Sequence, residues 1–227
     1  MRKFHSKNHP QHIKIKPQTI VIVLAVTFSL LIGCSHTEKV RVPPRVELKP
    51  YNYIGVVEFS TNAEDNLGPY VTQNFIQHVQ SAQPGTLIIE LGSQEQILRA
   101  VGRNKLDLET IKLIGHKFQI DAVITGHLKV SEIIPKVNVF SVSESLNASA
   151  DIEALLSTRL LETGRGATLW TQATSGKTSV ANLNLIKDGS IKFGISDPKE
   201  KYGKLVPNLV YVNTTDFRYR YEYRKVK

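Results

Sequence analysis

The strongest constraint on the fold is a stretch of strict alternation in the second half of the chain. From Leu146 to Leu160 every second residue is small or apolar, with Thr158 among them, and the residues between them are polar except for Leu155. This period of two is typical of an antiparallel strand with one buried face and one face in water. The turn residues TGRG follow at 163–166, and residues 167–180, ATLWTQATSGKTSV, have the composition of a returning strand. The sequence therefore predicts a long antiparallel hairpin.

The first half of the mature chain has a different pattern. Residues 53–59, YIGVVEF, and residues 86–91, TLIIEL, are short apolar runs bounded by turn-forming residues, as expected for buried strands. The segment between them places its apolar residues on one helical face, with Asn66 as a candidate cap and Pro69 in the first turn. This β-α-β order predicts parallel pairing of the two strands.

Two further helices and a third strand are predicted next. A short helical stretch contains Ile97, Leu98 and Val101, and Asp107 is placed to cap a second stretch in which Leu108, Ile111, Ile114 and Phe118 share a face. Residues 121–130, DAVITGHLKV, have the composition of a strand. The expected fold is thus a single α/β domain with a mixed sheet: a β-α-β opening, two further helices, the antiparallel hairpin and a C-terminal element.

The C-terminal element has two readings. Leu205, Val206, Leu209 and Val210 have helical spacing, and Pro207 would either break that helix or mark its beginning. Beyond Asp216, aromatic and charged residues alternate with a period of two, as in a strand. Strand and helix both stay open for the tail. Residues 183–203 are expected to be a loop with one short strand at 190–195, SIKFGI.

The N-terminus has the features of a secretory signal peptide. Residues 1–33 contain five basic residues and no acid, followed by an apolar run from Thr19 to Ile32. This run is shorter than the ~20 residues that a membrane-spanning helix requires. It ends in Leu31-Ile32-Gly33-Cys34, which resembles a bacterial lipobox. We expect residues 1–33 to be removed, residues 34–52 to form a lipidated cysteine and an extended tether, and residues 53–227 to form the periplasmic domain.

In a lipobox the cysteine thiol accepts a diacylglyceryl group, the peptide is cut before it, and the new amine receives a fatty acid such as palmitate. Several acyl chains on Cys34 would anchor the protein stably to a bilayer. Ser35, rather than an aspartate, after the cysteine resembles lipoproteins sent to the outer membrane. The expected location is therefore the outer membrane, with the domain facing the periplasm.

Charge and cysteine content exclude several classes of function. The chain has 29 basic and 20 acidic residues, so loss of the five basic residues of the signal peptide leaves 24 minus 20, or +4. This modest charge argues against nucleic-acid binding. With Cys34 acylated, the mature chain has no thiol for disulfides, catalysis or metal ligation.

Five segments together resemble one known group of proteins. They are the lipobox, PPRVELKPYNYIGVVEF at 43–59, DAVITGHL at 121–128, LLETGRGATLW at 160–170 and LVPNLVYVNTTDFRYRY at 205–221. In these segments the chain is similar to envelope lipoproteins related to the curli-secretion lipoprotein and the TolB N-terminal domain. The resemblance covers most of residues 43–225, and its motifs are structural. It implies a mixed α/β domain, a bacterial envelope location and a role in secretion, envelope assembly or activation of wall synthesis.

One departure from the curli-secretion lipoprotein affects the expected function. About 20 residues, Leu128 to Asn147, stand where pore-forming relatives need several tilted strands of ~9–11 residues each. We do not expect this chain to form such a pore.

No catalytic or metal-binding pattern stands out. The four histidines that survive cleavage, His36, His78, His116 and His127, form no i, i+4 pair and no HExxH motif. Gly164-Arg165-Gly166 lacks the lysine and the serine or threonine of a phosphate-binding loop. Asp151 and Glu153 are two apart on a strand, but the alternation places them on its solvent face. We predict no enzyme activity, no cofactor and no metal.

The aromatic and basic tail is the candidate interaction surface. Its residues are Arg218, Tyr219, Arg220, Tyr221, Tyr223 and Arg224. Contact with acidic lipid headgroups, lipopolysaccharide or a protein partner would use their charge and aromatic rings. The alternative is an element whose tyrosines pack on the sheet while its arginines face water.

Three functional hypotheses follow. The first is a non-enzymatic outer-membrane lipoprotein that acts in assembly, secretion or docking, bound to the bilayer through Cys34 and to an envelope protein or to further copies of itself. The second is a lipoprotein that activates a peptidoglycan-synthesis enzyme, although a flexible tether of about 18 residues spans little of the periplasm. The third is a hydrolase or ligand-binding module whose site is assembled from scattered residues, for which convergent titratable groups in a pocket would be the signal.

Overall fold

A computed structural model of the protein describes residues 37–63, 66–131, 134–137, 148–181, 183–185, 191–193 and 202–225. The predicted signal peptide, Cys34, Ser35 and His36 lie outside the described residues. The chain divides into two compact units. The larger unit spans Val42–Arg220, and the smaller unit joins the residues up to Arg41 with Tyr221–Lys227.

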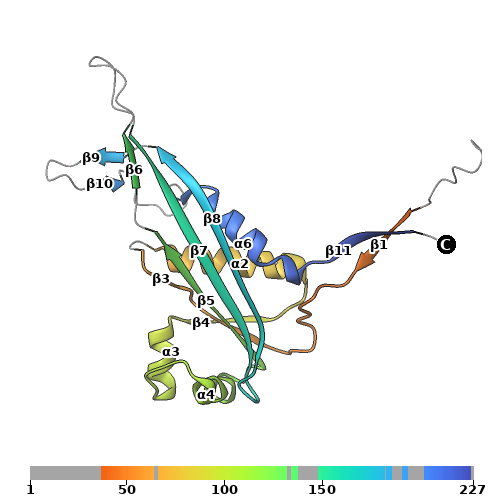
Figure 1. The fold of residues 1–227 in the computed structure, drawn as a ribbon. Coiled ribbons are helices and arrows are strands. Elements are labelled where there is room, and N and C mark those ends of the chain that lie inside the picture. Colours follow the sequence, from red (N-terminus) through yellow and green to blue (C-terminus); the bar gives the residue numbers. More distant parts are fainter. Residues whose placement is uncertain are drawn as a thin grey trace, which may run out of the picture. The chain divides into compact units, whose positions relative to one another are not determined.

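The main sheet belongs to the larger unit and is mixed, as predicted. Its seven described strands are β2 (Ile54–Val57), β3 (Ser60–Thr61), β4 (Ile88–Gly92), β5 (Ala122–Val130), β6 (Ile134–Val137), β7 (Ala148–Glu162) and β8 (Thr168–Ala181). Strands β4, β2, β5 and β7 follow one another across the sheet, β6 and β8 also pair with β7, and β3 pairs with β5. Figure 1 shows the long β7–β8 pair running through this sheet.

The predicted hairpin is confirmed and has a well-defined register. Strand β7 pairs with β8 in antiparallel fashion from Ser149, opposite Ala181, to Leu161, opposite Thr168, with one irregularity after Leu160. On its other side β7 is antiparallel to β5 and β6. The alternating residues of β7 therefore contribute Ile152, Leu156 and Leu160 to the core, as their period of two predicts.

The predicted β-α-β opening is also confirmed, with one correction. Strand β2 is parallel to both β4 and β5, and all four of its residues are buried. The prediction that residues 86–91 form a buried strand is wrong, because β4 pairs only with β2 and forms an edge of the sheet. An edge strand has a neighbour on one side only, so Leu87 and Ile89 remain exposed although they are apolar.

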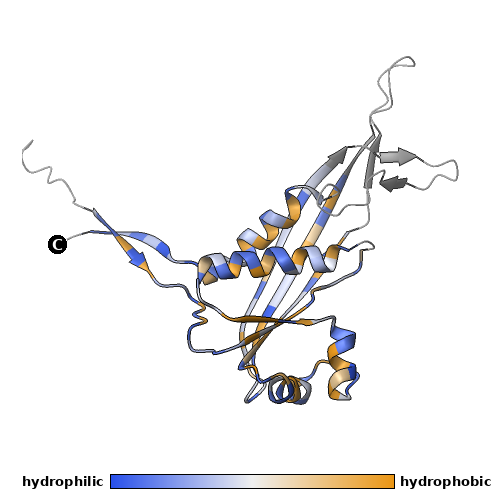
Figure 2. Ribbon diagram, turned by 180° about the vertical axis from the view of Figure 1, so that it is seen from behind, coloured by the Kyte–Doolittle hydropathy of each residue, from blue (hydrophilic) through white to orange (hydrophobic). Residues whose placement is uncertain are grey.

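Four α-helices are described, and they cover the two faces of the sheet. They are α2 (Leu67–Ala82), α3 (Gln94–Val101), α4 (Leu108–Phe118) and α6 (Leu205–Asn213). Helices α2 and α6 pack with Ile54, Ile124 and Leu156 on one face, in a core that contains Phe75, Leu209 and Phe217. Helices α3 and α4 form a smaller core on the other face with Val57, Val123 and Leu161. Figure 2 shows hydrophobic and hydrophilic residues interspersed along these helices, as expected when one side of each is buried.

The helix ends agree in part with the predicted caps. The Asp107 carboxylate accepts a hydrogen bond from the Thr110 backbone N–H at 2.9 Å, so it caps α4 as predicted. Asn66 is the residue before α2, but its side chain makes no capping hydrogen bond. Leu108 is exposed rather than on the buried face of α4, because it is the first residue of the helix.

Both readings of the C-terminal element describe part of it. The helical spacing corresponds to α6, with Pro207 in its first turn, where a missing N–H costs no hydrogen bond. A short 3-10 helix η1 (Thr215–Phe217) follows, and the period of two corresponds to strand β11 (Arg220–Lys225). The predicted strand within 190–195 is present as β10 (Ile191–Phe193), antiparallel to β9 (Leu183–Leu185).

Part of the predicted tether is ordered. Residues Thr37–Val42 form strand β1, which pairs with β11 in a separate two-stranded sheet, hereafter the ribbon. Val46 and Leu48 are buried in the core of the larger unit. Their apolar side chains, placed two apart in an otherwise polar segment, explain why this part of the chain packs.

Gln83, at the end of α2, holds the segments that lead to β1 and β11. Its buried side-chain amide accepts a hydrogen bond from the Leu48 N–H at 2.8 Å. It donates to the carbonyl oxygens of Val46, at 2.6 Å, and Phe217, at 3.0 Å. The Val46 N–H also donates to the Asp216 carbonyl oxygen at 3.1 Å. The two segments, about 170 residues apart in sequence, are therefore fixed side by side within the larger unit.

Candidate functional site

The predicted tail surface is shared between the two units. Arg218, Tyr219 and Arg220 belong to the larger unit, while Tyr221, Tyr223 and Arg224 belong to the smaller one. The structure therefore does not define these six residues as one continuous surface.

Arg218 is committed to packing in the larger unit. Its guanidinium lies over the Tyr211 ring of α6, with Cζ 3.7 Å from the ring centroid. The same group donates to the Tyr211 carbonyl oxygen and, at 3.0 Å, to the Thr214 hydroxyl. Partial burial, together with the positive charge of Arg218, lowers the pKa of the neighbouring His78. Arg218 thus links the segment after η1 to α6 and Thr214.

The ribbon exposes the aromatic part of the tail. Tyr221 and Tyr223 are 57% and 72% exposed. The Lys39 ammonium of β1 lies 4.4 Å from the centroid of the Tyr221 ring. Arg224 pairs with Glu222 at 3.6 Å. The exposed aromatic residues therefore stand among cations from both strands.

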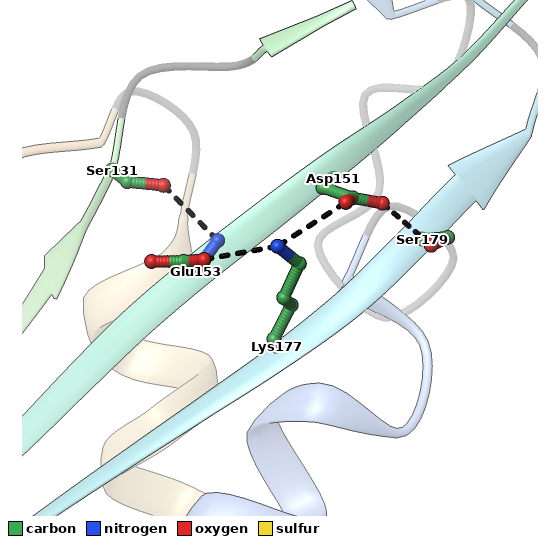
Figure 3. Close-up of polar contacts among 5 residues, drawn as sticks. All are labelled: Ser131, Asp151, Glu153, Lys177 and Ser179. Atoms are coloured by element: carbon green, nitrogen blue, oxygen red, sulfur yellow. Dashed lines mark hydrogen bonds and ion pairs between the residues drawn. The ribbon is translucent and has the colours of Figure 1, made fainter. Parts of the chain in front are cut away.

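A second group of polar side chains lies on the β7–β8 hairpin (Figure 3). The Lys177 ammonium of β8 bridges two carboxylates of β7, Asp151 at 3.2 Å and Glu153 at 3.0 Å. Ser179 donates to the other oxygen of Asp151 at 2.7 Å, and the Glu153 N–H donates to the Ser131 hydroxyl at 3.0 Å. We call these five residues the hairpin cluster. The register produces it, because Asp151 lies opposite Ser179 and Glu153 opposite Lys177.

The hairpin cluster corrects one sequence expectation. Glu153 is exposed, as the alternation predicts, but Asp151 is only 8% exposed. The strand has neighbours on both sides at this point, since Asp151 pairs with Ile134 of β6 as well as with Ser179. A buried carboxylate requires a compensating charge, and Lys177 supplies it.

The electrostatics of the hairpin cluster favour a structural role. Hydrogen bonds to Glu153 and then to Asp151, reinforced by the negative charges of both, raise the pKa of Lys177. A lysine that acts as a general base or activates a serine needs the opposite shift. Lys177 is therefore a paired cation that joins the two strands.

One hollow of the larger unit lies at the hairpin cluster, and another lies at the turn end of the hairpin. One, of about 440 Å³, lies on the outer side of the hairpin and is lined by residues that include Lys129, Glu153, Leu155 and Lys177. The other, of about 800 Å³, lies beside α4 and the hairpin turn, and His116 is among its lining residues.

The remaining histidines are dispersed. His78 packs edge-on against Tyr211, with ring centroids 6.0 Å apart. His127 is exposed on β5 and shares a hydrogen bond of 2.9 Å with the Ser60 hydroxyl. Among the described residues, no three His, Cys, Asp or Glu side chains are grouped so that they could hold a metal ion.

Sequence reasoning missed two sets of residues. Lys177 gives no signal by itself, because counting back from the turn at 163–166 places Glu153 opposite Gly176. The irregularity after Leu160 shifts the register by one residue and brings Lys177 opposite Glu153. Lys39 and Arg41 were assigned to the tether, and nothing local shows that they pair with the tail. Only the long-range pairing of β1 with β11 brings Lys39 over the Tyr221 ring.

Comparison with protein-family models gives no match, and comparison with curated proteins gives none either. The solved structures that match include a PelC dodecamer from Paraburkholderia phytofirmans, with a TM-score of 0.38 and 11% identity over 80% of this chain and 98% of that chain. Lipoprotein GNA1162 from Neisseria meningitidis matches with a TM-score of 0.36 and 18% identity, over 56% of this chain and 83% of that chain. The LpoB C-terminal domain from Escherichia coli matches with a TM-score of 0.35 and 11% identity, over 66% of this chain and 93% of that chain.

A lipoprotein is thus among the solved structures similar to this chain. At these TM-scores and identities, the function of the chain has to be inferred from its own residues. Within the described parts of the chain, no helix combines the length and the hydrophobicity needed to cross a membrane.

Proposed function

We propose that this protein is a lipid-anchored, non-enzymatic docking component of the bacterial cell envelope, held in the outer membrane with its α/β domain in the periplasm. The observation that carries the proposal is Leu31-Ile32-Gly33-Cys34, directly behind a basic segment and a short apolar run. Acylation of Cys34 gives the protein its bilayer anchor, and removal of residues 1–33 leaves Cys34 at the new N-terminus.

The polar groups of the larger unit support a docking role over catalysis. The hairpin cluster neutralises its own charges, because one ammonium joins two carboxylates. Its lysine has a raised pKa, which removes the base that a Ser–Lys hydrolase would need. The function then depends on surfaces that bind other envelope components, including an envelope protein or further copies of the chain.

The anchor is tested by changing the acylated residue. Cys34→Ser removes the thiol that accepts the diacylglyceryl group, so the protein should keep residues 1–33 and lack the acyl mass. The measurement is mass spectrometry of the N-terminal peptide from cells that express the full chain. An acylated, processed N-terminus in the Cys34→Ser protein would refute the proposal.

Ser35→Asp is the matched variant for location. It leaves the lipobox intact, so acylation should proceed. An aspartate directly after the acylated cysteine, in place of Ser35, should retain the protein in the inner membrane. Fractionation of inner and outer membranes measures this directly. Unchanged outer-membrane recovery of the Ser35→Asp protein would contradict the predicted location and leave the anchor intact.

The docking partner is tested by in-cell crosslinking of the full-length protein, with mass spectrometry of the crosslinked species. Ladders of the chain with itself would support an assembly or secretion component. Crosslinks to one peptidoglycan-synthesis enzyme would instead support the activator alternative. A protein that crosslinks to neither itself nor any envelope protein would count against docking.

A further inference from the structure

The ribbon brings the C-terminal tail close to the proposed anchor. Strand β11 pairs with β1, and β1 begins at Thr37, three residues after Cys34. Three residues of fully extended chain span at most about 11 Å. Whatever path these residues take, the start of the ribbon stays within about one Debye length of the bilayer surface that holds Cys34.

The two faces of the ribbon differ in charge. Side chains alternate between the faces of a strand, and Lys39 lies over Tyr221, so these two residues share a face. By alternation that face, hereafter the basic face, consists of Thr37, Lys39, Arg41, Tyr221, Tyr223 and Lys225. All six residues are exposed. The basic face therefore has three cations, two tyrosines and no acid.

The opposite face is balanced. It consists of Glu38, Val40, Val42, Arg220, Glu222 and Arg224. Two arginines and two glutamates cancel, and one pair, Arg224 and Glu222, is in contact at 3.6 Å. The net charge of the ribbon, +3, therefore lies entirely on the basic face.

We infer that the basic face of the ribbon binds the anionic phospholipid headgroups of the membrane that holds the anchor. This inference rests on the proposed acylation of Cys34 for its geometry and on charge complementarity for its partner. Lysine and arginine close to an anionic bilayer are attracted to it, and tyrosine prefers the headgroup region because its ring is apolar and its hydroxyl is polar. The basic face is then a second membrane contact, which fixes how the ribbon lies on the bilayer surface.

The test uses the full chain with Cys34→Ser, so that its outcome does not depend on acylation. The protein is floated with phosphatidylcholine vesicles, with or without about 30% phosphatidylglycerol. Residues 1–33, with their five basic residues and apolar run, contribute equally to every variant. The test variant adds Lys39→Gln, Arg41→Gln and Lys225→Gln, which neutralise the basic face.

The matched control removes the same charge from the larger unit, through Arg103→Gln, Arg165→Gln and Lys204→Gln. These three cations are also exposed. Each cation near the surface raises the affinity for an anionic bilayer about fivefold, so the test variant should bind vesicles containing phosphatidylglycerol about 100-fold more weakly. The affinity of the control variant should change little. Raising the salt concentration should reduce the difference between the two variants.

Two outcomes would overturn the inference. Equal weakening by the control would mean that net charge, not the basic face, governs binding. Equal binding of the parent to both kinds of vesicle would exclude the anionic headgroup and leave the face to a protein partner. Unchanged Trp170 fluorescence verifies that each variant is folded. A variant with Tyr221→Ser and Tyr223→Ser tests the aromatic part of the basic face without altering its charge. The mass of the Cys34 peptide tests the anchor separately.

Discussion

Replacing Gln83 by methionine should destabilise the larger unit more than any surface change on α2. Methionine has nearly the volume of glutamine but cannot form the three hydrogen bonds of the amide. Gln83→Met would leave the Leu48 N–H and the carbonyl oxygens of Val46 and Phe217 without this partner. The substitution thus isolates hydrogen bonding from packing.

The expected loss follows from those three groups. A buried backbone group that loses its partner costs roughly 1–3 kcal/mol, and the lower value suits groups that water can reach after a small movement. Burying methionine instead of an amide offsets part of the loss. We expect the free energy of unfolding to fall by about 3 kcal/mol. For a unit of this size that corresponds to about 6–12 °C in Tm.

Trp170 makes this loss measurable. It is the only tryptophan, its indole N–H donates to the Asp216 carboxylate at 3.2 Å, and its ring lies 4.8 Å from that of Phe217. During urea or thermal unfolding of the detergent-purified chain, its fluorescence therefore reports on the region around Phe217 to which Gln83 is hydrogen-bonded. Gln77→Ala, at an exposed position of the same helix, is the control and should change Tm little. A Gln83→Met protein as stable as the Gln77→Ala protein would refute the reasoning.

Two further substitutions test α4. A Cβ on Gly115 would lie 2.3 Å from the Cβ of Thr163, whose buried hydroxyl donates to the Ile120 carbonyl oxygen, so Gly115→Ala should cost about 1–3 kcal/mol; an unchanged urea midpoint would contradict this contact. Hydrogen bonds from the backbone N–H and then the side chain of Thr110 lower the pKa of Asp107 to about 2. Because the folded pKa lies below the unfolded one, the stabilisation is complete above pH about 4 and is lost as the pH falls towards 2. Asp107→Asn keeps a capping oxygen but does not titrate, so hydrogen exchange in α4 should lose its pH dependence in that window; an unaltered pH dependence would show that other groups cause it.

The elements predicted best from sequence are those fixed by local pattern. The alternation from Leu146 to Leu160 specifies both the strand and its buried face, because a period of two has no other common origin. The order of strand, helix and strand at residues 53–91 similarly restricts pairing to the parallel arrangement. The position of a strand within the sheet depends on which distant segments pair with it. The apolar TLIIEL segment at 86–91 therefore predicts a buried strand, although the strand lies at an edge of the sheet.

The candidate sites were harder to predict because they depend on partners distant in sequence. Asp151 is buried rather than solvated because Lys177, on the returning strand, neutralises it. The sequence predicts a basic and aromatic tail, yet Arg218 packs on Tyr211 of α6, and the cation over Tyr221 is Lys39 of the N-terminal segment. Composition identifies such residues, but only the three-dimensional pairing shows which of them share a face.

The hydrogen bonds of Gln83 connect this pairing to the proposed anchor. The side chain binds the backbone at Val46 and at Phe217, so the chain enters the larger unit after β1 and leaves it before β11 at adjacent points. Two strands that start side by side have a small entropic cost of pairing, even though they are far apart in sequence. A buried amide at the end of α2 therefore favours the pairing of β1 with β11 in the ribbon. On this reasoning Gln83→Met should weaken vesicle binding through the basic face, whereas Gln77→Ala should not.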